Sequence, residues 1–201
     1  MAESLGNLPR LWDRFWFSAI DPRAVGRVKQ SFAVLAGLMF FSGLFWAPSW
    51  LAADGWFGLQ AGRYFIGQGM PDTGSQYRWS VLYWLTTSGV AQALCVGGIL
   101  SCLAMFLGVG GRFAPLLAWA GLIMLHHRAP WFTLSAEFLA CAGLFYLIIT
   151  PAGPGSIGTL YWLEKPRAHP SWRASVLGNL SLRCLQIHWL LWIGMSLASM
   201  L

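Results

Sequence analysis

Residues 28–48 read VKQSFAVLAGLMFFSGLFWAP and carry a single charge, on Lys29. The hydrocarbon core of a bilayer is about 30 Å thick, and a helix needs about 20 apolar residues to cross it. This stretch is long enough to cross, and it is too long for the apolar core of a signal peptide. It therefore predicts a membrane-spanning helix, which Asp21 and Pro22 would start as an N-cap and a first-turn proline.

The composition of the whole chain supports a membrane protein. Of its 201 residues, 57% are apolar and only 10% are charged, whereas roughly 25% of the residues in soluble domains are charged. A soluble domain of this size cannot hide so much apolar surface. The four cysteines lie in apolar stretches and lack the spacing of a metal site or a disulfide framework. These features exclude a soluble enzyme, a disordered chain and a disulfide scaffold.

Four further stretches are apolar enough to be spans. The predicted spans are 28–48, 83–107, 113–125, 131–150 and 182–201. Within residues 1–20, apolar side chains recur at helical spacing opposite Arg10, Asp13 and Arg14, which is typical of an amphipathic helix lying on a membrane surface. The expected fold is therefore all-α: a single domain over residues 1–201, forming a polytopic membrane bundle of about five transmembrane helices plus interfacial amphipathic helices.

The distribution of cations predicts the orientation. Of the 13 Lys and Arg residues, three (Arg63, Arg78 and Arg128) fall on one side of a five-span bundle, and the other ten fall on the side of the N-terminus. The positive-inside rule then places the N-terminus in the cytoplasm and the C-terminus outside, and we expect a bacterial inner membrane. The cations form no basic face, so nucleic acid is not an expected partner.

One polar cluster stands out, His126-His127-Arg128 followed by Glu137. We expect Glu137 about two turns into the fourth span, where an ionisable group is costly unless it is paired or hydrated. One hypothesis is an acid/base or ligand pocket near the outer surface, with His126, His127 and Glu137 as candidate catalytic residues. The other is a structural ion pair that joins two helices. Adjacent histidines on a helix point about 100° apart, which suits one metal ion poorly, so no metal site is predicted.

Two further sets of residues are predicted to make contacts inside the membrane. Gln186 and His188 are expected to hydrogen-bond across helices, and with Arg27 and Arg128 they are candidates for contact with lipid, a quinone or a partner. Small side chains along one side of the second span favour close helix packing, against another span or another chain. These are Ala91, Cys95, Gly97, Gly98, Ser101 and Cys102.

Several short motifs occur in a characteristic order. They are Asp21-Pro22-Arg23 with Arg27, Arg78-Trp79-Ser80-Val81-Leu82, Leu107-Gly108 with Arg112, His126-His127-Arg128-Ala129-Pro130, Pro151, and Arg183-Cys184-Leu185-Gln186-Ile187-His188. Together they cover most of residues 20–195 and resemble the horizontally transferred transmembrane (HTTM) domain. That domain is shared with the vitamin K-dependent gamma-carboxylases, so the resemblance implies a helical membrane domain related to those enzymes.

The chain departs from that family near its last predicted span. In the family a Gly-x-x-Lys-like ending follows, and the resemblance implies that its lysine is the catalytic base of the carboxylases. In register, Ser196 and Ser199 stand at the glycine and lysine positions. A serine hydroxyl has no accessible free-base form near neutral pH and cannot replace an amine as proton acceptor. We therefore expect a truncated relative without the later spans and outer domain, which performs neither carboxylation nor quinone epoxidation.

Two functional hypotheses follow. The favoured one is a non-catalytic accessory subunit that packs against partner proteins, lipid or pigment in a larger membrane complex, respiratory or photosynthetic. The alternative is a small gamma-carboxylase-like membrane enzyme, or a quinone- or lipid-binding protein, that uses His126, His127, Arg128 and Glu137. We expect membrane lipids and other membrane subunits as partners, and a bound lipid, quinone or pigment as any cofactor.

Overall fold

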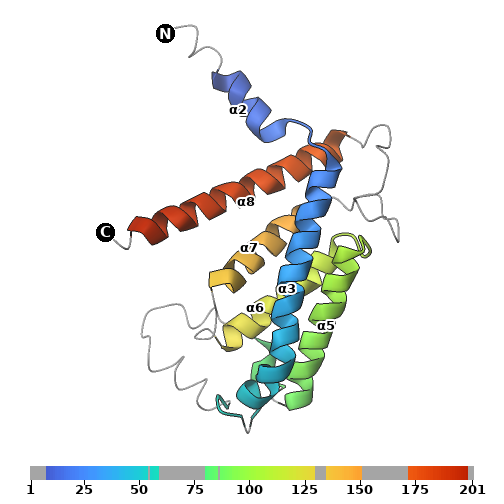
Figure 1. The fold of residues 1–201 in the computed structure, drawn as a ribbon, viewed down its shortest axis with the longest axis vertical. Helices are drawn as coiled ribbons and strands as arrows, with labels where there is room; N and C mark the ends of the chain where they lie inside the picture. Colours follow the sequence, from blue (N-terminus) through green and yellow to red (C-terminus); the bar gives the residue numbers. More distant parts are fainter. Residues whose placement is uncertain are drawn as a thin grey trace.

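The computed structural model describes residues 8–53, 55–58, 80–85, 87–129, 135–150 and 172–198. Within these ranges the chain is helical and contains no β-strand (Figure 1), which confirms the all-α prediction. The α-helices are α2 (Leu8–Phe17), α3 (Pro22–Leu51), α5 (Ser88–Phe106), α6 (Phe113–Arg128), α7 (Ser135–Ile149) and α8 (Trp172–Ala198). A short 3-10 helix, η2 (Val81–Tyr83), precedes α5.

Two of these helices are long and apolar enough to cross a membrane. They are Ala24–Leu51 within α3, with mean hydropathy 1.6, and Ser88–Phe106, with mean hydropathy 1.9. Ala136–Ile149 in α7 is also apolar but shorter. Length and composition therefore support membrane association through α3 and α5, while the other three predicted spans remain predictions from the sequence.

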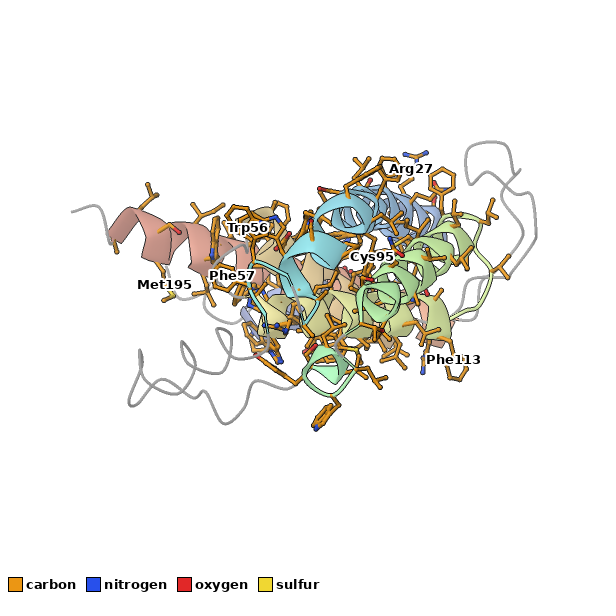
Figure 2. The ribbon with its side chains drawn as sticks, turned by 90° about the horizontal axis from the view of Figure 1, so that it is seen from below. Arg27, Trp56, Phe57, Cys95, Phe113 and Met195 are labelled. Atoms are coloured by element: carbon orange, nitrogen blue, oxygen red, sulfur yellow. The ribbon has the colours of Figure 1, made fainter. Side chains whose placement is uncertain are left out.

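α3 and α5 pack closely through small side chains. Cys95, Gly98 and Cys102 of α5 are buried in this contact, and Cys95 lies between the two helices (Figure 2). A Cβ atom added to Gly98 would come within 2.4 Å of the Phe40 ring, so only glycine permits this approach. The buried members of the small-residue set predicted for the second span therefore face α3 of the same chain.

Two phenylalanines of α3 extend this packing to α6 and α7. Phe40 is fully buried and also lies over Gly121 of α6, whose added Cβ would be 3.0 Å from the ring. Phe32 lies over Gly143 of α7, where an added Cβ would be 2.0 Å away. The helix α3 also contacts α8. The helix α3 is therefore the central element, and α5, α6, α7 and α8 all contact it.

A glycine turn reverses the chain between α5 and α6. Gly108 and Gly110 have φ angles of 73° and 82°, which glycine adopts without a Cβ clash. Beside the turn, Gln30 Nε2 donates to the Phe106 carbonyl over 3.3 Å and joins the start of α3 to the end of α5. From α3 through α5, α6 and α7 the chain direction alternates, and α8 crosses α3 obliquely (Figure 1).

Helix α8 begins at Trp172, about ten residues before the predicted span. Residues 172–181, which the prediction left between the spans 131–150 and 182–201, are therefore helical as well. The polar residues Asn179 and Ser181 interrupt the apolar run that the prediction followed. Both are buried, because Asn179 bonds to α2 and Ser181 Oγ donates to the Tyr146 carbonyl over 2.5 Å.

Two other helix starts also differ from the prediction. α5 begins at Ser88 instead of residue 83, because Tyr83 belongs to η2. Ser80 starts η2 by accepting a hydrogen bond from the Leu82 amide over 3.3 Å. In the described residues α7 begins at Ser135, so Glu137 lies in its first turn, whereas the predicted span begins at residue 131. A carboxylate is favoured there, because the first helical N–H groups are unpaired and carry partial positive charge.

The predicted amphipathic helix within residues 1–20 corresponds to α2, which contacts α8. Asn179 Nδ2 donates to the carbonyls of Phe15 and Trp16, over 2.9 and 3.1 Å, and to Ser18 Oγ over 3.3 Å. Those carbonyls end α2 and have no partner within their own helix. Asn179 therefore caps α2 and fixes it to α8. Residues 59–79 and 151–171, which belong to the two longest segments between predicted spans, lie outside the described residues.

Candidate functional site

A groove of about 360 Å³ lies between α6, α7 and α8, and we call it the aromatic groove. Its size falls within the range of small-molecule sites, which are mostly apolar with a few polar groups. The aromatic and polar residues of its wall are Trp119, His126, His127, Phe138, Phe145, Tyr146 and His188. Two of the predicted catalytic candidates and one residue of the last predicted span therefore share one groove.

Ring contacts between neighbouring helices hold these side chains in place. Trp119 of α6 lies 5.8 Å from Phe145 of α7, measured between ring centroids. The His126 imidazole meets the Phe138 ring edge-on at 5.4 Å. Such edge and offset arrangements are favourable for aromatic rings. The wall of the groove is therefore fixed by packing between α6 and α7.

Tyr146 and His188 form a polar pair in the aromatic groove. The Tyr146 hydroxyl oxygen lies 3.4 Å from His188 Nδ1, and the two rings are 5.9 Å apart. A phenol donates or accepts a hydrogen bond, and a neutral imidazole does both. One member of the pair can therefore donate a hydrogen bond to a ligand carbonyl while it stays hydrogen-bonded to the other member.

His126 and Glu137 meet at a second, smaller cavity. It has a volume of about 20 Å³ and is also lined by Trp46 and Cys141. That volume suffices for a single water molecule, which needs polar partners of this kind. A water held there would join the carboxyl group of Glu137 to the imidazole of His126. The structure thus brings these two predicted residues together, although they lie on different helices.

Arg128 lies away from the aromatic groove, in a buried contact at the ends of the helices. Its side chain is 2% exposed, and Nη2 donates to the carbonyls of Leu51 and Phe57, over 3.4 and 2.7 Å. The guanidinium stacks on the Tyr83 ring at 5.4 Å, and the Tyr83 hydroxyl donates to the His127 carbonyl over 3.1 Å. Arg128 therefore joins the end of α3 to η2 and α6.

The other predicted contact residues lie apart from one another. Gln186 is exposed on α8 and accepts a hydrogen bond from Arg183 Nη1 over 2.9 Å. Arg27 points outward from α3 (Figure 2). Ala91 is buried with the three small residues that face α3, whereas a Cβ on Gly97 would meet nothing within 4 Å. Ser101 Oγ donates to the Gly97 carbonyl over 2.8 Å on that open side.

Trp119 and Tyr146 line the groove but were not predicted from the sequence to be site residues. Tyr146 carries a signal that was available, because a phenol in an apolar helix needs a hydrogen-bond partner. Its partner, His188, is 42 residues away on another helix, and helix periodicity does not give the relative rotation of two helices. Within the described residues, no group of three or more His, Cys, Asp or Glu side chains is placed to hold a metal ion.

Comparison with protein-family models, with curated proteins and with solved structures finds no match for this chain.

Proposed function

We propose that this chain is a non-catalytic integral membrane protein with five spans that binds one quinone-type molecule in the aromatic groove. The observation that carries the proposal is the combination, in one groove of about 360 Å³, of aromatic walls with the Tyr146–His188 pair. The N-terminus lies in the cytoplasm, following the positive-inside rule. The resemblance to the HTTM domain is part of this proposal and agrees with the ligand class.

The chemistry of a quinone suits this groove. Its ring is planar and apolar, so it stacks against aromatic walls such as Trp119 and Phe145. Its two carbonyl oxygens only accept hydrogen bonds. The donors available to them are the Tyr146 hydroxyl and the imidazole N–H groups of His126, His127 and His188. The alkyl tail of such a molecule would leave the groove between helices and enter the surrounding lipid.

We propose binding without carboxylation. Ser196, which stands where the family has glycine, uses its hydroxyl within α8 by donating to the Trp192 carbonyl over 2.9 Å. Ser199 stands at the lysine position and lies outside the described residues. A serine hydroxyl does not supply the proton-accepting amine that carboxylation requires.

A second candidate function, an accessory subunit of a larger complex, has its own support. A purely apolar groove of about 370 Å³ runs between α3 and α5, lined by residues that include Leu38, Phe41 and Leu103. The last turns of α8 also expose Leu190, Leu191 and Met195 and extend away from the other helices (Figures 1 and 2). These surfaces suit contact with lipid or with helices of another subunit.

Quinone binding is tested by titrating the full chain, purified in mild detergent, with decylubiquinone. Quenching of tryptophan fluorescence reports binding. The quenching that is lost in a Trp119→Phe variant is the part of the signal that arises in the groove. Tyr146→Phe is expected to weaken binding roughly threefold to tenfold, because one hydrogen bond to the ligand is lost. The matched control is Tyr83→Phe, which removes a phenol hydroxyl outside the groove wall. Unchanged affinity in both Tyr146→Phe and His188→Ala contradicts the proposal.

The accessory-subunit candidate predicts a different result. In native electrophoresis from mild detergent, the chain would migrate with other proteins and bind no quinone. Glu137→Gln and His127→Ala would then release it from that complex. A chain that migrates alone and binds decylubiquinone excludes this second candidate.

A further inference from the structure

The contact between α2 and α8 contains two buried hydrogen-bond donors without an acceptor. Trp16 Nε1 and Arg183 Nε are both inaccessible to solvent, and neither donates to any atom of the described residues. The Phe15 ring connects them: it meets the Trp16 ring edge-on at 5.2 Å, and the Arg183 guanidinium lies over it at 4.4 Å. Both donors therefore lie beside one phenylalanine, and we call this place the α2/α8 junction.

One edge of the Arg183 guanidinium has no hydrogen-bond acceptor among the described residues. Its Nη1 donates to Gln186 over 2.9 Å. The opposite edge, formed by Nε and Nη2, receives no acceptor from the part of the chain that the structure describes. Two parallel N–H groups on one edge of an arginine match two oxygens of a phosphate or carboxylate. A buried donor without an acceptor is unfavourable, so an anionic acceptor brought to Arg183 or to Trp16 would be stabilising.

The surface around the junction indicates where such an anion comes from. On α2, Leu11, Trp12 and Phe15 are exposed on one side of the helix, and Arg10, Asp13 and Arg14 lie on the other. A helix of this kind lies in the interface of a membrane with its apolar side among the acyl chains. Asn179 fixes α2 to α8 at the junction. The two donors are therefore held beside the level at which lipid phosphates lie.

We propose that the α2/α8 junction binds the phosphate of one anionic phospholipid, with Arg183 and Trp16 as its donors. Arg183 supplies the charge and the paired N–H groups, and Trp16 supplies a third N–H. The bound lipid joins α2 to the bundle on the side assigned to the cytoplasm. This inference rests on the membrane insertion proposed above, but not on quinone binding in the aromatic groove.

Native mass spectrometry of the full chain in mild detergent tests the proposal. The protein is titrated with phosphatidylglycerol and with diacylglycerol of the same acyl chains, which lacks the phosphate. The unmodified chain is expected to retain the former and not the latter. Arg183→Gln should weaken phosphatidylglycerol binding about fivefold, the contribution typical of one basic residue at a membrane surface. Trp16→Phe keeps an aromatic ring without the N–H and should weaken binding roughly threefold.

Two matched controls separate a specific site from general attraction. Arg14→Gln removes one positive charge, as Arg183→Gln does, but from the polar side of α2. Trp12→Phe removes an exposed indole. Both should bind phosphatidylglycerol like the unmodified chain. Equal loss of phosphatidylglycerol binding in Arg14→Gln and Arg183→Gln overturns the proposal. Undiminished binding in both Arg183→Gln and Trp16→Phe overturns it as well. If excess inorganic phosphate displaces the lipid, the junction binds free phosphate and the lipid assignment is wrong.

Membrane sedimentation distinguishes a failure of the lipid site from a failure of the proposed membrane insertion. If an alkaline carbonate wash releases the chain from membranes, the proposed insertion fails and the lipid site fails with it. If the chain stays in the membrane and the two junction variants keep full binding, the lipid site alone fails. Thermal unfolding of Arg183→Gln and Trp16→Phe confirms that loss of binding does not reflect loss of fold.

Discussion

Arg128 illustrates how a charged residue in an apolar chain is accommodated. It sits in the sequence beside two histidines that line the aromatic groove, yet its side chain turns to the ends of the helices. There Nη2 donates to the carbonyls of Leu51 and Phe57. Leu51 is the last residue of α3, so its carbonyl has no partner within the helix. Arg128 thus satisfies backbone groups that burial would otherwise leave unpaired.

Arg128→Gln is expected to lower the free energy of unfolding by about 1–3 kcal/mol, because buried carbonyls lose a charged donor. Thermal unfolding in detergent, followed by circular dichroism, measures the change. Arg27→Gln is the control, since Arg27 is exposed on α3 and its loss should change stability by no more than about 0.5 kcal/mol. Equal stability of the two variants contradicts this role for Arg128.

At this scale the sequence predicted part of the site. Glu137 follows the two histidines in the sequence, and the structure brings it to a cavity that His126 also lines. Tyr146 was missed, and the hydrogen bond between Arg183 and Gln186 was not expected. Such pairs depend on how each helix is rotated about its axis. A sequence gives the spacing of side chains along a helix but does not give that rotation.

Between helices, packing depends on pairing large rings with glycines. Phe40 lies over Gly98 and Gly121, and Phe32 lies over Gly143. In lipid no hydrophobic drive brings helices together, so close van der Waals contact supplies much of the association. The small-residue stripe of α5 was visible in the sequence. Phe40, the ring that fills it, was not, because α3 has many exposed aromatic and aliphatic residues of equal apolar character.

Gly98→Ala is expected to destabilise the protein by about 1–3 kcal/mol, because the new methyl group would overlap the Phe40 ring. Gly97→Ala is a closely matched control on the same helix, where an added Cβ meets nothing within 4 Å. There the better helix propensity of alanine should leave stability unchanged or raise it by up to about 1 kcal/mol. Thermal unfolding of the two variants measures the difference. The reverse order of stability would contradict the packing described for α3 and α5.

The attachment of α2 depends on one side chain. Asn179→Ala removes the hydrogen bonds to the carbonyls of Phe15 and Trp16 and should expose the backbone of α2 to solvent. Faster amide hydrogen exchange in residues 8–17, with little change in α5, is the expected result. Ser18→Ala removes only one of the three acceptors and should have a smaller effect. Unchanged exchange in Asn179→Ala would show that ring contacts alone hold α2.

For the whole molecule, the direction of α3, α5, α6 and α7 alternates (Figure 1). Two helices meet the length and hydropathy expected of a span. Counting apolar residues predicted the helices well where runs are long, as in α3. It failed at the start of α8, where buried polar residues are paired with α2 and α7 and therefore do not mark a loop.

Cysteine labelling in sealed vesicles tests the five-span proposal. In a background without the four native cysteines, Arg14→Cys should react with a membrane-impermeant maleimide only from the cytoplasmic side. Trp56→Cys and Ala198→Cys should react only from the outer side, because one and five spans respectively separate them from α2. Leu38→Cys, within α3, should not react from either side. Labelling of Arg14→Cys and Ala198→Cys from the same side would rule out an odd number of spans.

The central position of α3 has a consequence for biosynthesis. Because a chain is made from its N-terminus, α3 leaves the ribosome before every helix that contacts it. Each later helix then packs against a helix that has already been made. Phe40 is therefore present before the glycines of α5 and α6 that pack against it. A misplaced α3 would therefore disturb the packing of every later helix, whereas a misplaced α8 would disturb only the last packing step.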